Sequence, residues 1–330
     1  MAQWHGLVHG GRMTQNFDVV VVGGGAAGLS AALMLGRSRR SVLVLDAGEP
    51  RNAPAAGVHG LLGHEGTPPR ELLRAGRAEV EAYGAVVHPA RARAAVRDDA
   101  GFTLTLDDDT AVHARRIVLA TGVVDQLPAV DGLADRWGRD VLHCPYCHGW
   151  EVRDRKIVVL ATSPMAVHQA LLFHQLSADV TLLLHQQPAP SDEQAEELAA
   201  IDVRVVAGEV ARVVVEDDAV TGLALASGEI VAAEAVVVGS RPVARPDLLA
   251  DLGLQTHDLP NNMGTAVAAD AMGVTAVPGV WAAGNLTDPY AQVGASAAAG
   301  AKAGAMVNAD LAAEEAREAV RRRRALQPAS

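Results

Sequence analysis

The sequence predicts an α/β protein built from two Rossmann-like nucleotide-binding units, the second of which is inserted into the first. Three observations predict this fold. A GxGxxG motif at residues 23–28 lies between two short apolar strands. A second strand–helix–strand pattern begins at residue 156. A late apolar segment at residues 277–285 ends in glycine, and a helix of small residues follows it, which indicates that the chain returns to the first unit.

The first unit is a complete strand–helix–strand pattern. Residues 17–22, FDVVVV, form a short β-branched run that glycines end, which is typical of a buried parallel strand. A helix is expected over residues 29–40 and a second buried strand over residues 41–46. Because the GxGxxG motif stands between strand and helix, it predicts a dinucleotide site rather than an ordinary glycine-rich turn.

The three glycines of this motif and the acid that follows it each have a physical role in binding a dinucleotide. Gly23 permits the tight turn, and Gly25 lets backbone N–H groups approach a pyrophosphate. Gly28 lets the helix pack closely on the strand. Asp46 ends the second strand 18 residues beyond the last glycine, where an acid can accept hydrogen bonds from a ribose.

The middle of the chain repeats this kind of pattern. A buried strand is expected over residues 156–160, a helix over 165–176 and a strand over 180–184. The late helix is expected over residues 292–313. The domain limits that follow are residues 14–124 and 244–320 for a first domain in two parts, and residues 125–243 for the inserted domain. Further strand-like stretches are residues 203–206, 212–216, 223–226 and 235–239.

Composition excludes several classes of protein. The net charge of −11 argues against nucleic acid as a partner, and the basic run at residues 321–324 is interpreted as a solvated helix end. No apolar run suggests a membrane span. Residues 1–12 have no apolar core and do not resemble a secretion signal, and Met13 is a candidate natural start. With two cysteines in all, the chain is expected to be soluble and cytoplasmic.

Both cysteines lie in the stretch HCPYCHGW at residues 143–150. A zinc site is one interpretation, but adjacent residues point apart, and structural zinc sites draw ligands from two separated pairs. A purely structural disulfide is another, but closing so small a loop stabilises little. The dinucleotide site in the same chain favours the third interpretation, a redox-active dithiol, and no metal is expected.

Several motifs together resemble the low-molecular-weight thioredoxin reductase family. They are the glycine motif at residues 23–28, ATG at 120–122, the pair Cys144 and Cys147, and GVWAAGN at 279–285. The resemblance covers about residues 14–313. It implies an FAD-dependent pyridine nucleotide-disulfide oxidoreductase fold, with the FAD domain in two discontinuous pieces and the CxxC in the middle domain. It also implies a homodimer in which the cysteine pair exchanges electrons with the flavin.

The resemblance also assigns FAD-binding positions. Where the family carries an acid in the late motif, this chain has Asn285, which can hydrogen-bond but carries no charge. Gln292 and Val293 match the start of a helix whose positive N-terminus faces the flavin and stabilises its anionic reduced form. By position the FAD-binding residues are then Gly23, Gly25, Ala26, Ala27, Gly28, Asp46, Ala120, Thr121, Gly122, Gly284, Asn285, Gln292 and Val293.

The resemblance gives the two cysteines different roles. The cysteine nearer the C-terminus, Cys147, would face the flavin, and Cys144 would exchange with substrate. The reductases carry an acid just after the pair, where this chain has His148. A histidine titrates near neutral pH and can take a proton from an incoming thiol. The expected catalytic residues are therefore Cys144, Cys147 and His148, with His143 as a neighbour.

The second nucleotide unit lacks the features that NAD(P)H needs. Its loop at residues 161–166 reads ATSPMA where GxGxxA is expected, so that Ala161 and Ser163 place a Cβ where a pyrophosphate should approach. Pro164 removes one donor N–H. Residues 185–190 contain no arginine for a 2′-phosphate and no acid for a ribose. The sequence therefore argues against NAD(P)H as the electron donor.

The chain looks closer to a branch of the family that carries CxxCH, the flavin dithiol oxidases that close disulfides in natural products such as gliotoxin and holomycin. That resemblance implies oxidation of a small-molecule or protein dithiol, with O₂ as acceptor and H₂O₂ as product. Two alternatives stay open. One is a disulfide reductase of the thioredoxin reductase type fed by NAD(P)H or another donor, and the other is a flavin-bound redox sensor.

Overall fold

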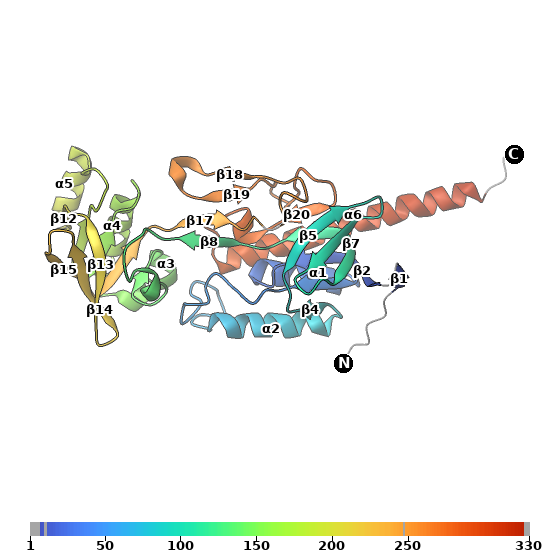
Figure 1. The fold of residues 1–330 in the computed structure, drawn as a ribbon, viewed down its shortest axis with the longest axis horizontal. Coiled ribbons are helices and arrows are strands. Elements are labelled where there is room, and N and C mark those ends of the chain that lie inside the picture. Colours follow the sequence, from blue (N-terminus) through green and yellow to red (C-terminus); the bar gives the residue numbers. More distant parts are fainter. Residues whose placement is uncertain (1–6, 10–11, 247, 327–330) are drawn as a thin grey trace.

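A computed structural model describes residues 7–9, 12–246 and 248–326 (Figure 1). The N-terminal segment 1–12, in which the sequence indicates no secretion signal, lies mostly outside these described residues. Within them, no helix combines the length and the apolar character that a membrane span requires.

The first unit is an eight-stranded sheet whose main path runs β4–β3–β2–β7–β6–β5. Strands β2, β3, β4 and β7 are parallel, while β5 and β6 form an antiparallel extension. The late strand β20 pairs in parallel with β7, although residues 120–279 separate the two in the chain. The strands are β1 (Leu7–His9), β2 (Arg12–Val22), β3 (Val42–Leu45), β4 (Val86–His88), β5 (Ala92–Arg97), β6 (Phe102–Leu106), β7 (Ala111–Leu119) and β20 (Val280–Ala282).

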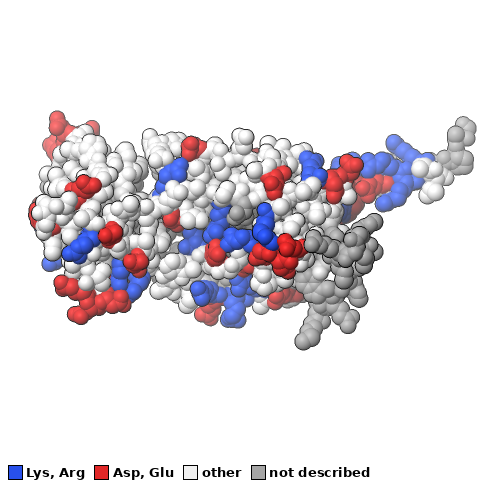
Figure 2. All heavy atoms as spheres, in the orientation of Figure 1, with Lys and Arg blue, Asp and Glu red and all other residues white. Residues whose placement is uncertain are grey.

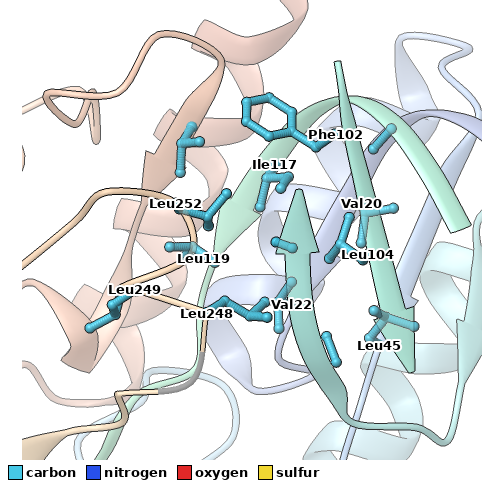
Figure 3. Close-up of a cluster of buried hydrophobic side chains, with 14 of the residues drawn as sticks. Val20, Val22, Leu45, Phe102, Leu104, Ile117, Leu119, Leu248, Leu249 and Leu252 are labelled. Carbon is cyan, nitrogen blue, oxygen red and sulfur yellow. The ribbon is translucent and has the colours of Figure 1, made fainter. Parts of the chain in front are cut away.

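Both faces of this sheet are covered, which explains why the last four residues of β2, 19–22, are all valine. Val19 and Val21 pack into the cluster under the helices, and Val20 and Val22 pack into a second cluster on the opposite face. In that second cluster, leucines from the segment after residue 247 lie against β6 and β7 (Figure 3). The three helices of this unit are α1 (Ala26–Arg37), α2 (Pro69–Ala82) and α6 (Val293–Ala325).

Helices α1 and α6 cross so closely that the backbone of one contacts the backbone of the other. A Cβ at Gly300 would overlap the carbonyl oxygen of Ala27, and one at Gly304 would overlap that of Ala31. The small residues of the late helix therefore let it lie directly on the helix that follows the GxGxxG motif. This crossing places the N-terminus of α6 beside the nucleotide motif.

Helix α6 continues beyond the limit expected from its small residues and projects from the body of the molecule (Figure 1). The basic run 321–324 forms its exposed last turns, and basic side chains gather there in Figure 2. Positive charge suits the negative end of a helix dipole. The run is thus a solvated helix end, as the sequence indicated.

The second unit is a parallel sheet in the order β12–β11–β10–β16–β9, and the antiparallel sheet β13–β14–β15 packs beside it. Helices α4 and α5 belong to this unit. Its strands are β9 (Val141–Leu142), β10 (Ile157–Leu160), β11 (Val180–Leu183), β12 (Arg204–Val206), β13 (Val210–Glu216), β14 (Ala219–Leu225), β15 (Ile230–Ala232) and β16 (Ala235–Val238). Its helices are α3 (Pro145–His148), α4 (Ala166–His174) and α5 (Asp192–Ala200), and the small sheet β18 (Thr256–Asp258) with β19 (Thr265–Val267) follows later in the chain.

Two antiparallel strands, β8 (Val123–Gln126) and β17 (Arg241–Ala244), connect the two units (Figure 1). We propose the limits 14–124, 125–243 and 244–320 for the two-part first domain and the inserted domain. Strand pairing supports this proposal, because β20 joins the first sheet while β9 to β16 pair only among themselves. The structure thus contains two packed cores that the paired strands link.

Candidate active site

A single cavity of about 1040 Å³ extends from the glycine motif to the cysteine pair. Cys144, Cys147 and His148 line it, and so does His143. Gly28 and Gly284 do not line it and lie behind its wall. The other predicted FAD-binding residues that do line it are Gly23, Gly25, Ala26, Ala27, Asp46, Ala120, Thr121, Gly122, Asn285, Gln292 and Val293.

The glycines of the motif have the surroundings that a dinucleotide site needs. Gly23 has φ +110°, and a Cβ there would overlap the carbonyl oxygen of Ala120. Gly25 caps the N-terminus of α1, and open space lies where its Cβ would be. A Cβ at Gly28 would overlap the carbonyl oxygen of Gly23, so this glycine serves helix packing. The open position at Gly25 lets a pyrophosphate approach the helix N-terminus.

Asp46 lies at the carboxyl end of β3 and is already engaged. Its carboxylate accepts a hydrogen bond from the Gly48 N–H at 2.9 Å and pairs with Arg77 at 2.5 Å. Its side chain is 14% exposed, so a ribose hydroxyl could share it from the cavity side. Arg77 comes from α2, a helix that the strand–helix–strand pattern does not reveal, and sequence reasoning missed it.

The cavity contains unpaired polar groups that fit FAD. Thr121 Oγ1 and Ser296 Oγ are buried, line the cavity, and have no hydrogen-bond partner among the described residues. A buried hydroxyl without a partner is unfavourable unless a ligand or water supplies one. Together with the open cradle at Gly25, these groups suit a dinucleotide with many hydrogen-bonding atoms.

Asn285 supports the loop in front of α6. Its Nδ2 donates to the carbonyl oxygens of Asp288 at 3.1 Å, Pro289 at 3.4 Å and Ala291 at 2.8 Å. A carboxylate at this position could not donate to those oxygens. The amide therefore shapes the 288–291 loop, and only its oxygen is left for the contact with cofactor that the sequence suggested.

The cysteine pair forms a disulfide with its Cα atoms 5.3 Å apart. Cys144 is the N-cap of α3, and its Sγ accepts a hydrogen bond from the Cys147 N–H at 3.1 Å. Cys147 Sγ accepts from Gln292 Nε2 at 3.7 Å, and Gln292 is the N-cap of α6. Cys147 is therefore the cysteine that touches the first domain, while Tyr146 at the tip of the loop is 69% exposed.

His148 lies next to this disulfide and is half-buried. Burial lowers the pKa of His148 below its ordinary value, with Glu151 acting in the opposite direction and His59 and Arg155 adding to the lowering. The ring is therefore neutral at pH 7 and can accept a proton. His59 also lines the cavity, with its Nδ1 2.6 Å from Glu65 and its Nε2 3.5 Å from Glu151.

His143 is stacked on Trp137, with ring centroids 5.5 Å apart. Burial lowers the pKa of His143 to about 4, and the positive charge of Arg51 adds to this effect. His143 is therefore neutral across the working range of most enzymes.

We expect this neutral ring to make stability pH-dependent. Because the folded protein binds the proton less readily than the unfolded chain, stability is complete above about pH 6.5 and falls as the pH drops towards 4. The total is on the order of 3 kcal/mol. A His143→Phe variant should lose this part of the slope when thermal midpoints are measured between pH 4 and pH 7.5. An identical slope in both proteins would contradict the assignment.

The loop at residues 161–166 carries side chains where the family has glycines, and residues 162–165 also line the large cavity. Thr162 Oγ1 donates to the carbonyl oxygen of Gly239 at 3.0 Å. Gln169 Nε2, in the first turn after the loop, donates to the carbonyl oxygen of His143 at 3.2 Å. Beyond the next strand, His185 Nδ1 accepts from the Val210 N–H at 3.0 Å, which turns its ring inward.

The cleft beside this loop is small, about 120 Å³. None of the described residues that line it is an arginine, lysine, aspartate or glutamate. A nucleotide there would find no cation for a phosphate and no acid for a ribose. Among the described residues there is likewise no group of three or more His, Cys, Asp or Glu side chains that could hold a metal ion.

Known proteins with a similar sequence or structure place this chain in a family. Residues 17–307 match the family model described as pyridine nucleotide-disulphide oxidoreductase. The chain is 44% identical to HlmI, whose crystal structure it matches with a TM-score of 0.85 over 96% of this chain and 98% of HlmI. It is 35% identical to an oxidoreductase from Agrobacterium tumefaciens, with a TM-score of 0.84 over 90% and 99% of the two chains.

Two fungal relatives match a shorter stretch. Thioredoxin reductase tcpT of Claviceps purpurea is 36% identical over 174 residues, which is 50% of this chain and 54% of tcpT. Thioredoxin reductase sirT of Leptosphaeria maculans is 34% identical over 181 residues, which is 51% of this chain and 55% of sirT. The chain thus spans about half the length of these curated relatives. It belongs to the pyridine nucleotide-disulphide oxidoreductase family and is similar to thioredoxin reductases.

Proposed function

We propose that the protein is an FAD-dependent dithiol oxidase, which converts a dithiol substrate into a disulfide through Cys144 and Cys147 and uses O₂ as the final acceptor. The observation that carries the proposal is the loop at residues 161–166. It holds no glycine cradle, and Thr162 ties it to Gly239. The disulfide meanwhile shares one cavity with the flavin-type glycine motif. The glycine motif therefore supports FAD as the electron acceptor of the cysteine pair. Residues 162–165 also line this cavity, but they offer no glycine cradle for NAD(P)H.

The geometry supports a particular order of attack. A substrate thiolate attacks Cys144 Sγ, forms a mixed disulfide and breaks the bond to Cys147, which leaves as a thiolate. The second substrate thiol then attacks the substrate sulfur of the mixed disulfide and releases Cys144. The substrate has lost two electrons and two protons, and the cysteine pair has gained the two electrons. Cys147 lies on the side of Gln292, which leaves Cys144 as the sulfur for the incoming substrate.

His148 supplies the base in this scheme. Its ring is neutral at pH 7 because burial lowers its pKa, and it lines the same cavity as both sulfurs. We propose that His148 accepts the proton of the second substrate thiol, because a thiolate attacks a disulfide far more efficiently than a thiol. Glu151 on the same segment favours the protonated ring, so the charge that His148 gains has an acid nearby.

The residues at the glycine motif and at the start of α6 would hold FAD. Thr121 and Ser296 offer it unpaired hydroxyls, and Gly25 offers it the N-terminus of α1. When bound, FAD supplies a two-electron acceptor between the reduced cysteine pair and O₂, with H₂O₂ as the product. The proposal extends to a homodimer on the family resemblance and to a cytoplasmic location on the low cysteine content. The substrate is a small-molecule or protein dithiol.

The test is to mix the FAD-loaded protein with dithiothreitol, NADPH or NADH without oxygen and to follow the flavin absorbance. We expect rapid bleaching by dithiothreitol only, and one H₂O₂ for each dithiothreitol oxidised when air returns. Rapid bleaching by NADPH or NADH would overturn the oxidase in favour of a disulfide reductase, the activity that the names of tcpT and sirT state for those proteins. Failure of all three to bleach the flavin would favour a redox sensor.

A further inference from the structure

The connection between the two domains is slender. Only β8 and β17 cross from one domain to the other, and the four residues of each pair with those of the other. Domains joined in this way are expected to move relative to each other unless something fixes them. Electron transfer from the reduced cysteine pair requires a fixed distance to the flavin end of the cavity, so contacts that hold the two domains in place directly affect turnover.

A connector clamp, made of Arg51, Asp125 and Ser240, lies at this crossing. Arg51 Nε and Nη2 each donate to the Asp125 carboxylate at 2.7 Å, which is a bidentate pair. Ser240 Oγ donates to the same carboxylate at 2.8 Å. Arg51 belongs to the loop after β3 in the first domain. Asp125 is in β8, and Ser240 directly precedes β17, so one carboxylate joins both connecting strands to that loop.

The clamp is shielded from water. The side chain of Asp125 is 7% exposed and that of Arg51 is 21% exposed. Burial raises the pKa of Asp125, but the hydrogen bonds and charge of Arg51 outweigh this and hold the pKa below its usual value. The carboxylate is thus ionised at neutral pH. Removing either partner would leave a buried charge without its counter-charge, so the pair acts as a unit.

The third donor of Arg51 links the clamp to the disulfide. Arg51 Nη1 donates to the carbonyl oxygen of Pro289 at 2.6 Å, in the loop that Asn285 also supports. That loop leads directly into Gln292, whose amide contacts Cys147 Sγ. One guanidinium therefore holds the two connecting strands and the loop that presents Gln292 to Cys147.

We infer that Arg51 is a positioning residue that holds the inserted domain in one orientation, with Cys147 kept at the flavin end of the cavity throughout turnover. The inference rests on the proposed dithiol oxidase function, in which the inserted domain binds no nicotinamide nucleotide. Such an enzyme gains nothing from turning that domain away from the flavin. Arg51, Asp125 and Ser240 also line the cavity, and the clamp acts on electron transfer from the cysteine pair by fixing the crossing strands.

The test compares Arg51→Ala, Asp125→Asn and the double variant with the wild type, all loaded with FAD. We expect the anaerobic rate of flavin bleaching by dithiothreitol, per bound flavin, to fall about 10- to 100-fold in each single variant. The double variant should be no slower than the single ones, because both remove the same unit. Arg51→Lys keeps the charge but not the planar fork, and should recover part of the rate.

Hydrogen–deuterium exchange gives a readout that does not depend on activity. The amides of residues 123–126 and 241–244 should exchange faster in Arg51→Ala than in the wild type, with or without FAD. The matched control is Arg116→Ala. Arg116 pairs with Asp310 at 2.7 Å and Glu314 at 2.9 Å within the first domain and away from the cavity. It should lower stability while leaving the bleaching rate and the exchange at both connecting strands unchanged.

Each outcome decides one question. If Arg51→Ala and Asp125→Asn bleach within about two-fold of the wild type and exchange at the connecting strands is unchanged, the clamp does not position the disulfide. If the wild type itself is not bleached by dithiothreitol, the proposed function fails, and exchange alone then decides whether the clamp holds the domains. If Arg51→Ala does not fold, Asp125→Asn supplies both the bleaching rate and the exchange rates, because it only replaces one carboxylate oxygen by an amide nitrogen.

Discussion

A Cys144→Ser variant should remain yellow with FAD but lose dithiol oxidation to below the detection limit. The substitution removes the sulfur that the substrate thiolate attacks, and Cys147 alone cannot form the internal disulfide. The loop should survive, because Cys144 is the N-cap of α3 and its Sγ accepts the Cys147 N–H. Serine is among the preferred residues at an N-cap. Steady-state H₂O₂ formation with dithiothreitol, together with the flavin spectrum, measures both expectations.

Cys147→Ser is the matched control for the order of attack. It should also lose turnover, yet its remaining Cys144 should react with a thiol reagent such as 5,5′-dithiobis(2-nitrobenzoate) faster than Cys147 does in Cys144→Ser. Mass spectrometry of the two adducts measures this difference. Cys147 contacts Gln292 of the first domain, which predicts that it is the less accessible sulfur. Faster labelling of Cys147, or turnover in Cys144→Ser, would reverse or remove the assigned roles.

A His148→Gln variant should lose about 10²- to 10⁴-fold in kcat at pH 7, the usual range for loss of a general base. The neutral ring of His148 takes the proton of the second substrate thiol in the proposed scheme. Above the pKa of the thiol, roughly 8.5 for a cysteine, the substrate is already a thiolate and the base is no longer needed. The defect should therefore shrink as the pH rises from 7 to 9.5.

The pH dependence separates this role from a structural one. An effect of His148→Gln that is equally large at pH 7 and pH 9.5 would argue for a loss of loop geometry instead of a loss of base. His168→Gln serves as the control, because His168 is an exposed histidine of α4 that does not line the cavity. It should behave like the wild type at both pH values, as measured by initial rates of H₂O₂ formation with dithiothreitol.

Local patterns in the sequence predicted much of the fold. The strand at residues 17–22 is a short apolar run that leads into the GxGxxG motif, and the strand at 235–239 is a similar run that ends in glycine. The strand at 157–160 is an equally apolar run followed by Ala161, and the structure places β2, β16 and β10 at these three positions. The helices α2 and α5 were missed. Both nevertheless carry start signals in the sequence. Helix α2 begins at Pro69 with Glu71 in its first turn, and α5 has a capping box between Ser191 and Gln194.

The site was predictable where its residues form motifs, and not where they meet only through the fold. The cysteine pair and the glycine motif share one cavity, as the sequence suggested. No pattern could join Arg51 to Asp125, because the partners lie 74 positions apart in the chain. The same applies to His59 and Glu151, which approach only because the loop after β3 folds over α3. The packing roles of Gly28 and Gly284, behind the cavity wall, likewise depend on neighbours from other elements.

The pairing of β8 with β17 has a consequence for how such a protein can be built. The chain leaves the first domain and returns to it at adjacent points, since Val123 lies opposite Ala244 and Gln126 opposite Arg241. The inserted domain therefore occupies the topological place of a hairpin loop. A short turn between β8 and β17 would join the two parts of the first domain and leave their fold unchanged. Another domain whose N- and C-termini lie close together could be inserted at the same point. The disulfide-bearing domain can therefore be exchanged for another, in evolution or by protein engineering, without changing the fold of the first domain.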